Sequence, residues 1–423
     1  MLYYLFRFFE TLGIPGSGLW EYISFRSLMA FIIALVVSLW LGKRFIKWMN
    51  EHKSLVEEKK FDESVDPAAH NRKFIPSMGG IVIIVAVLIP CLLLGRLRNV
   101  YLLLMLSTTI WLGITGFIDD FLKIKRDKNG LAPRWKLLSQ LGIGLLVGLT
   151  LYLSPDAVIC ENVDVRHHDG KIEIIHESNP AKSTVTTIPF FKNNNLDYAW
   201  FASWTGQYKQ AIGWGIFVAI TVFFIMFVSN GANLNDGMDG MAAGNSAIIY
   251  VVLAIFAYVS SHIGFASYFN IMFIPESQEL VVYISAFIGA LIGFLWYNAD
   301  PAQMFMGDTG SLTIGGSIAV IAVIIHKELL LPLLCGVFLA ELVSSALQTR
   351  YSAWGNRHGR KQRLFKRAPI HDSYSDKYDF QDDVNYAFRH SLNGNVANRK
   401  VVIRFWIVSV LLAALTIITL KIR

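Results

Sequence analysis

Charged residues are scarce in this sequence: 16% of its 423 residues are charged, whereas 54% are hydrophobic. A soluble chain of this length would carry more charge, and its hydrophobic residues would recur periodically rather than in continuous runs. Cysteine is also rare, because Cys91, Cys160 and Cys335 are widely separated and match neither a disulfide framework nor a metal-binding spacing. These shortages exclude a soluble globular enzyme and a disulfide-stabilised secreted domain.

Ten hydrophobic runs approach the length of a membrane-spanning helix. They predict an all-α integral membrane protein in which residues 1–423 form one polytopic domain, because a helix satisfies its backbone polar groups inside a bilayer. The predicted transmembrane helices are residues 25–41, 79–94, 101–118, 137–153, 212–228, 241–260, 280–297, 312–325, 329–347 and 405–420.

Lysine and arginine are concentrated in the connections after the first, third and ninth predicted spans. Cytoplasmic loops of membrane proteins carry this excess, so both termini are predicted to be extracytoplasmic and residues 350–404 to form a cytoplasmic basic loop. Arg96 and Arg98, in a short connection on the other side, run against the rule. The net charge of +7 therefore reflects loops, and no nucleic-acid partner is expected. Residues 154–210 form the longest extracytoplasmic loop, with a predicted β-hairpin around Asp169-Gly170.

Acidic clusters follow the third, fifth and seventh predicted spans, so all of them fall on the cytoplasmic side. They are Asp119-Asp120, the pair Asp236 and Asp239, and the segment NADPAQMFMGDTGS, which contains Asp308. In that segment the glycines allow the backbone to approach a ligand closely, and Asp308 stands where a new helix starts. The convergence predicts an active site that faces the cytoplasm, although a lone aspartate there would more simply be a helix cap.

Lysines accompany the Asp119-Asp120 pair: Lys123 lies one helical turn beyond it, and Lys136 lies at the entrance of the next span. Neighbouring side chains on a helix diverge, so one acid can meet a metal while the other meets a substrate or a lysine. Carboxylate oxygens suit Mg²⁺, and lysines offset the charge of phosphates. The combination favours diphosphate chemistry at a membrane surface over a salt bridge at a helix end.

The cluster SNGANLNDGMDGMAAG is rich in glycine and asparagine at the end of the fifth span. Asn233 offers both a donor and an acceptor to a base or a ribose. Asn, Asp and Gly are also ordinary turn residues, so a turn with a cap is the simpler alternative.

The motifs GFIDDFLK, NLNDGMDGMA, NADPAQMFMGDTGSL and APIH, which ends at His371, together resemble the phospho-N-acetylmuramoyl-pentapeptide transferase family. This family belongs to the polyprenyl-phosphate N-acetylhexosamine-1-phosphate transferases, and the resemblance extends to PSMGG and to the ten-span layout. It implies an Mg²⁺-dependent transferase that moves phospho-MurNAc-pentapeptide from its UDP carrier to undecaprenyl phosphate and releases UMP. It also implies a multi-pass protein of the bacterial cytoplasmic (inner) membrane that acts in peptidoglycan synthesis, and it is compatible with a homodimer.

Carried onto this sequence, the resemblance implies catalytic roles for Asp119, Asp120, Asp308 and His371. Asp308 is the principal expected Mg²⁺ ligand, joined by Asp119 and Asp120. The implied substrate-binding residues are Lys73, Ser77, Lys123, Lys136, Asn233, Asp236, Asp239, Asn298 and Phe305.

Three features depart from the family pattern. Ser77 stands where the family usually has threonine, and a stretch one residue shorter makes Arg72 compete with Lys73 for the place of a family lysine. The family motif also continues into further histidines, whereas Asp372 follows His371 here. We expect His371 to keep the substrate-contacting role, with His390 as the competing candidate.

Two other functions compete with this one. A related transferase would use UDP-N-acetylglucosamine, although the residues of the motifs DPAQMFMGDTGS and APIH favour a transferase that acts on the muramyl donor. An ion-coupled transporter would place ionisable groups near the middle of the bilayer, whereas these acids lie at helix ends. Glu341, in the middle of the ninth span, is the residue that suits a transporter. A structural bond to neighbouring serines and a role lining a cleft are equally open for it.

Overall fold

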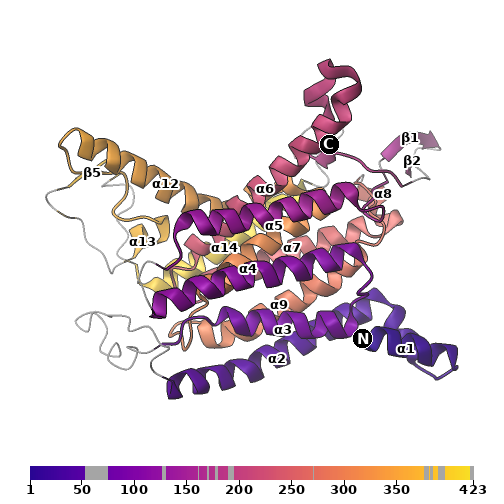
Figure 1. Ribbon diagram of the computed structural model, residues 1–423, viewed down its shortest axis with the longest axis horizontal. Helices are drawn as coiled ribbons and strands as arrows, with labels where there is room; N and C mark the ends of the chain where they lie inside the picture. The colour runs from indigo at the N-terminus through magenta and orange to yellow at the C-terminus, as the bar shows by residue number, and fades with distance from the viewer. Residues whose placement is uncertain are drawn as a thin grey trace.

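The structure is a computed structural model that describes residues 1–52, 75–125, 130–160, 162–168, 171–176, 180–188, 195–269, 271–375, 381, 384–388 and 396–419. Long helices run side by side and form a single bundle (Figure 1). They are α2 (Ile23–Glu51), α3 (Gly80–Leu94), α4 (Val100–Lys125), α5 (Pro133–Leu153), α6 (Lys209–Asn235), α7 (Met241–Ser260), α9 (Gln278–Asn298), α10 (Gly307–Ile324), α12 (Gly336–Arg357) and α14 (Asn398–Ile418).

The helical membrane architecture predicted from the sequence is confirmed. In the described part of the chain, 8 helices are long and apolar enough to cross a membrane. A ninth candidate is the bent pair Glu328–Leu334 and Gly336–Arg357, whose two parts meet at 77°. The remaining predicted span is α3, which is apolar but has only 15 residues. Each predicted range thus contains a helix, and the number ten stays a prediction.

Helix α10 lies at the centre of the bundle, and all of its residues from Asp308 to Ile324 are buried. It packs against α4 and α6, and its small residues allow close contact. A methyl group added to Gly315 would lie 2.5 Å from the carbonyl oxygen of Val228, and one added to Gly80 would lie 2.1 Å from the nitrogen of Gly310. A helix enclosed by other helices needs no large lipid-facing side chains, which explains why α10 has the lowest mean hydropathy of the 8 long apolar helices.

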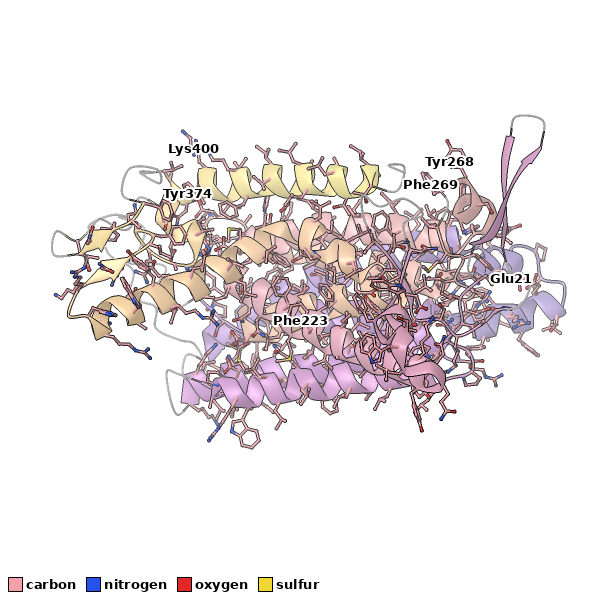
Figure 2. All side chains as sticks on the ribbon, turned by 90° about the horizontal axis from the view of Figure 1, so that it is seen from above. Glu21, Phe223, Tyr268, Phe269, Tyr374 and Lys400 are labelled. Carbon is pink, nitrogen blue, oxygen red and sulfur yellow. The ribbon has the colours of Figure 1, made fainter. Side chains whose placement is uncertain are left out.

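Short elements lie at the two ends of the bundle. At one end are α1 (Leu2–Thr11), η1 (Ser17–Glu21), η4 (Tyr198–Tyr208) and α8 (Ile263–Phe269), together with two antiparallel pairs of strands, β1 (Asn162–His168) with β2 (Lys171–His176) and β3 (Val185–Thr187) with β4 (Asn195–Asp197). At the other end are α13 (Ile370–Tyr374) and the parallel pair β5 (Gln362–Arg363) and β6 (Asn385–Tyr386). Figure 2 shows the β1–β2 hairpin projecting beyond Tyr268 and Glu21, far from Tyr374 and Lys400.

Several helices extend well beyond the predicted apolar ranges at the end that holds α13. Helix α4 continues to Lys125, α2 to Glu51 and α12 to Arg357, while α14 already begins at Asn398. The predicted basic loop 350–404 is therefore helical at both ends. As a result, Asp119 and Asp120 lie within a continuous helix whose geometry fixes where they point.

Candidate active site

Two segments far apart in the sequence pair through their backbones and build one wall of the site. The amide of Phe305 donates to the carbonyl oxygen of Pro76 at 2.8 Å, and the amide of Gly79 donates to that of Phe305 at 2.8 Å. The amide of Gly80 likewise donates to Met306 at 2.9 Å. The PSMGG segment is thereby fixed beside the start of α10, which explains why both motifs bear on one site.

Three buried carboxylates meet at this point. Asp119 and Asp120 come from α4 and Asp308 from the first turn of α10, and each offers an oxygen within 4.8 Å of the others. The close approach depends on Gly116, because a methyl group there would lie 2.3 Å from the carbonyl oxygen of Asp308. Oxygen-only ligands of this kind suit Mg²⁺.

Two lysines bridge Asp119 and Asp308. The Nζ atom of Lys123 lies 2.6 Å from Asp119 Oδ2 and 3.0 Å from Asp308 Oδ1. The Nζ atom of Lys136 lies 3.0 Å from Asp119 Oδ2 and 2.6 Å from Asp308 Oδ2. Although both ammonium groups are within ion-pair distance, Asp119 Oδ2 receives no well-aligned hydrogen bond. Ion pairing with the two lysines thus compensates the charge of this buried oxygen.

Asp120 has a different environment from its neighbour. Its Oδ1 accepts a hydrogen bond from the amide of Asp308 at 3.0 Å, and its Oδ2 accepts from the amide and the hydroxyl of Thr309 at 2.9 and 2.6 Å. These amides belong to the first turn of α10, which has no partner for them within its own helix. Asp120 therefore caps α10 from α4 and fixes the position of Asp308. Thr309 was not singled out in the sequence, because no local pattern shows that its hydroxyl reaches a carboxylate on α4.

Replacing Asp120 by asparagine is expected to destabilise the protein by about 2 kcal/mol, since hydrogen bonds to a charged acceptor contribute about 1.5–3 kcal/mol. The new amide group would also face the N–H donor of Thr309. The thermal unfolding of the purified variant in detergent measures this. Thr309→Val removes only the hydroxyl donor and should have the smaller effect; the cap assignment is wrong if Thr309→Val costs more than Asp120→Asn.

A polar cavity of about 190 Å³ opens beside the carboxylates. Most of the predicted site residues line it, together with Gly237, Met238 and Gly307. The predicted residues in its wall are Ser77, Asp120, Lys123, Asn233, Asp236, Asp239, Asn298, Phe305 and Asp308. Asp119 and Lys136 lie behind this wall in contact with Asp308 or its lysine partner. Lys73 and the competing Arg72 and His390 lie outside the described residues.

Some cavity residues also hold the surrounding loops together. Asn298 accepts a hydrogen bond from the amide of Gly240 at 3.1 Å and donates one to the carbonyl oxygen of Met304 at 2.9 Å. Asp239 accepts from the amide of Ala302 at 3.0 Å. Asn298 and Asp239 thus join the α6–α7 connection to the α9–α10 connection, and their contact with a substrate stays a prediction.

His371 lies against the α6–α7 connection rather than in the cavity wall. Its Nδ1 is 3.0 Å from Glu341 Oε2 and its Nε2 is 3.5 Å from Asp372 Oδ1. It is so close to Gly237 that a methyl group there would lie 2.1 Å from Nε2. The carboxylate of Glu341 is thus the partner of this histidine, a role that was not among the alternatives considered from the sequence.

The charge of His371 depends on that partner. Burial acts to lower the pKa of its imidazole, but the hydrogen bond and the negative charge of Glu341, with Asp372 and Asp236 nearby, outweigh burial and raise this pKa above its usual value. A raised pKa keeps the imidazole protonated to higher pH. Glu341 therefore favours the protonated form of this imidazole beside the cavity.

The chain is similar to known proteins over its whole length. Residues 102–326 match the model of glycosyl transferase family 4. The whole chain is 57% identical over 425 residues to a phospho-N-acetylmuramoyl-pentapeptide-transferase of Phocaeicola vulgatus and 58% identical over 427 residues to one of Bacteroides fragilis. It is also 48% identical over 426 residues to one of Porphyromonas gingivalis. In each case 100% of both chains is covered.

Proposed function

Because this chain belongs to the phospho-N-acetylmuramoyl-pentapeptide-transferase family, within glycosyl transferase family 4, we propose that its polar cavity and carboxylate cluster are the transfer site. The enzyme transfers phospho-MurNAc-pentapeptide from its UDP carrier to undecaprenyl phosphate, releases UMP and forms the first lipid-linked precursor of peptidoglycan. One observation supports this location of the transfer site. Three carboxylates and two lysines lie in contact at one end of the bundle, namely Asp119, Asp120, Asp308, Lys123 and Lys136.

The proposed topology is a multi-pass protein of the bacterial inner membrane with ten spans, both termini outside and the cavity facing the cytoplasm. Helix α3 and the bent pair ending in α12 would be the two spans beyond the 8 long apolar helices. The excess of lysine and arginine in three connections supports this orientation.

Asp308, Asp119 and Asp120 are proposed to hold Mg²⁺. The oxygen-only donor set fits this ion, and Asp119 Oδ2 has no well-aligned hydrogen-bond donor that would compete with it. The ion would supply positive charge that screens the two phosphate groups as they approach each other. Within the chain, Lys123 and Lys136 are placed to share that task once a substrate phosphate competes with the carboxylates for them.

The proposed reaction is a displacement at phosphorus. An oxygen of the lipid phosphate attacks the phosphorus attached to the sugar, a new P–O bond forms, and the P–O bond to UMP breaks. The second pKa of a phosphate monoester is near 6, so the attacking group is already largely deprotonated at neutral pH. Asp119 would orient the lipid phosphate or take up its residual proton. With two ammonium groups at 2.6 and 3.0 Å it is a poor nucleophile, which favours the one-step route over a carboxyl-phosphate intermediate.

Ser77, Asn233, Asp236, Asp239, Asn298 and Phe305 are proposed to bind the nucleotide and diphosphate, and Lys73 is proposed to join them. Phe305 would pack on the uracil ring. His371, with the charge that Glu341 stabilises, would attract the anionic donor from beside Gly237.

The proposal is tested by measuring UMP release from UDP-MurNAc-pentapeptide by the purified protein with undecaprenyl phosphate, with and without Mg²⁺. Release is expected only with the lipid acceptor and with the metal. UDP-N-acetylglucosamine, assayed in parallel, should release little UMP. Preference for that donor would instead identify an N-acetylglucosamine-1-phosphate transferase, and lipid-dependent UMP release from neither donor would overturn the assignment of the site.

The charge of His371 predicts a pH dependence of kcat/KM. Since the pKa of His371 is raised by Glu341, we expect kcat/KM to fall at alkaline pH as the imidazolium loses its proton. Glu341→Gln keeps a hydrogen-bond acceptor but removes the charge, so the alkaline fall should move to lower pH.

His358→Gln is the matched control, because this exposed histidine at the end of α12 bonds only to its own helix. It should leave the pH profile unchanged. An alkaline limb that is the same in wild type, Glu341→Gln and His371→Gln would show that His371 does not titrate in the reaction. If His371→Ala keeps its transfer activity while His390→Ala loses it, His390 rather than His371 corresponds to the histidine of the family motif.

A further inference from the structure

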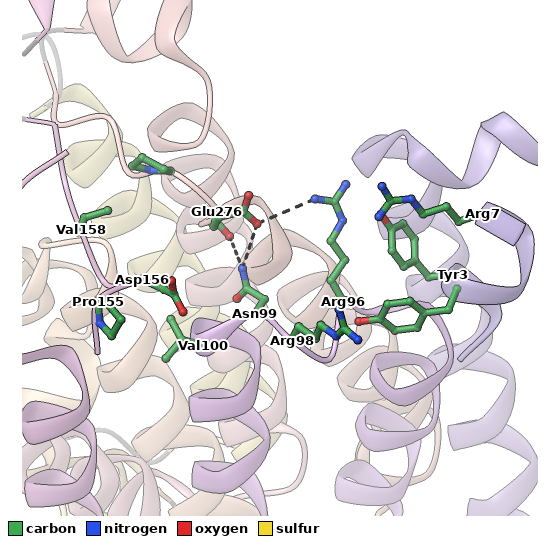
Figure 3. A pocket seen from close by; sticks show the side chains of 12 residues that line it. Tyr3, Arg7, Arg96, Arg98, Asn99, Val100, Pro155, Asp156, Val158 and Glu276 are labelled. Carbon is green, nitrogen blue, oxygen red and sulfur yellow. Dashed lines mark hydrogen bonds and ion pairs between the residues drawn. The ribbon is translucent and has the colours of Figure 1, made fainter. Parts of the chain in front are cut away.

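A second pocket lies at the end of the bundle opposite the polar cavity (Figure 3). It has a volume of about 530 Å³ and is lined by residues from α1, from the α3–α4 connection and from the segments next to α5 and α9. Val100, the first residue of α4, belongs to its wall, whereas Asp120, near the other end of α4, belongs to the polar cavity. Twenty residues of α-helix span about 30 Å, the hydrophobic thickness of a bilayer. The two sites therefore open at opposite membrane surfaces.

Beneath this pocket the acidic groups already have cationic partners. Arg26 and Glu279 form an ion pair at 2.7 Å in which both side chains are fully buried. Arg96 adds a second cation, with its Nε 3.4 Å from Glu279 Oε1 and its NH1 3.9 Å from Glu276. The side-chain amide of Asn99 also donates to the carbonyl oxygen of Glu276 at 2.9 Å. The buried charge of Glu279 thus needs no further cation.

Arg7 and Arg98 are left over from this network. Both line the pocket, both are exposed, and neither has an ion-pair partner among the residues that the structure describes. The guanidinium group of Arg96 lies 5.1 Å from the centre of the Tyr3 ring, and Figure 3 shows the side chains of Arg7 and Arg98 in the same part of the pocket. Asp156 is the one other acid in the wall besides Glu276, so the pocket carries net positive charge. A cationic pocket with unpaired guanidinium groups is suited to an anion.

Helix α1 places this pocket at the level of lipid headgroups. Leu5, Phe8 and Leu12 are 45%, 59% and 61% exposed and lie on one face at helical spacing. Tyr3 and Arg7 lie on the opposite face, toward the pocket. An amphipathic helix with an uncovered apolar face lies in the interface of a bilayer, with its polar groups among the headgroups.

We propose that Arg7, Arg98 and the tyrosines of α1 form a binding site for the phosphate of an anionic membrane lipid, on the membrane surface opposite the polar cavity. A guanidinium group presents a planar pair of donors that matches two phosphate oxygens. The site gives a reason for Arg96 and Arg98, the two arginines that violate the charge rule for loops. Arg96 pairs with the buried Glu279 and the exposed Glu276, and Arg98 binds a headgroup. This proposal does not depend on the transferase activity.

The test uses the full-length protein in a neutral detergent, titrated with phosphatidylglycerol or phosphatidylcholine, with bound lipid counted by native mass spectrometry. Wild type is expected to bind one phosphatidylglycerol in preference to phosphatidylcholine. Arg7→Gln/Arg98→Gln should weaken that binding about tenfold, which corresponds to about 1.4 kcal/mol. Arg98→Lys, which keeps the charge and the fold but loses the planar donors, should weaken it less.

Arg350→Gln/Arg357→Gln is the matched control, because it removes the same charge from α12 at the other end of the bundle. An equal loss of lipid from both double variants would show general electrostatic attraction and overturn the proposal. Inorganic phosphate without lipid is expected to leave the unfolding temperature unchanged. If it raises that temperature as much as phosphatidylglycerol does, and only when Arg7 and Arg98 are present, the ligand is a soluble anion and the lipid assignment is wrong.

Discussion

Asp308→Asn is expected to lower the rate of UMP release by about 100- to 1,000-fold, the usual result of removing one charged group that stabilises a transition state. Asp308 stands in the first turn of α10, held there by Asp120, and it accepts hydrogen bonds from Lys123 at 3.0 Å and Lys136 at 2.6 Å. Asparagine would keep the shape of the side chain but lose the charge that positions both ammonium groups and is proposed to hold Mg²⁺. Single-turnover UMP release, measured over a range of Mg²⁺ concentrations, gives the size of the effect.

Asp300→Asn is the control for this variant. Asp300 lies in the same connection between α9 and α10, but its carboxylate pairs with Arg399 outside the cavity. It should retain most of the wild-type rate. Unfolding temperatures of both variants separate a loss of activity from a loss of structure. Near-normal turnover of Asp308→Asn at limiting Mg²⁺ would contradict the assignment of Asp308 as a metal ligand.

Lys136→Gln is expected to reduce kcat/KM for the UDP-linked donor by about 100-fold, mostly through weaker donor binding. Lys136 and Lys123 together balance Asp119 and Asp308. Without Lys136 the two carboxylates share a single ammonium group, and an approaching diphosphate meets uncompensated negative charge. Equilibrium binding of the donor and steady-state kinetics together measure the effect.

Lys400→Gln provides the comparison, because Lys400 is exposed at the same end of the bundle (Figure 2). It removes the same charge without touching the carboxylates, and donor binding should stay within about twofold of wild type, because isolated surface charges contribute little. Protease protection of the loops reports on insertion. Intact donor binding in Lys136→Gln, together with failed insertion of α4 and α5, would show that this lysine serves topology rather than the substrate.

The sequence by itself determined the membrane class, the positions of the long helices and the family. Continuous apolar runs are a local property, so α3, α7 and α9 could be located within a few residues without knowledge of their neighbours. Helical geometry also predicted that Asp119 and Asp120 would face different partners. The structure agrees, since Asp119 meets two lysines and Asp120 meets the first turn of α10.

Helix ends were less predictable, because a helix can continue through polar residues after its apolar run has ended. The continuation of α2, α4 and α12 into polar sequence depends on packing against other segments. The weak signal of α10 has the same origin: its glycines serve contact with α4 and α6, which no single-sequence pattern reveals. The two adjacent aspartates likewise gave no sign of which one caps a helix.

Only the tertiary structure decided which distant residues act together. Glu341 and His371 are separated by 30 positions, and their pairing depends on how α13 packs against α12. Arg7 and Arg98 line the same pocket because α1 lies beside the α3–α4 connection. Charges interact through space over a few ångströms, whereas a sequence records only order along the chain. Most residues of the polar cavity could thus be predicted from the sequence, whereas the partner of each residue depends on how the helices pack.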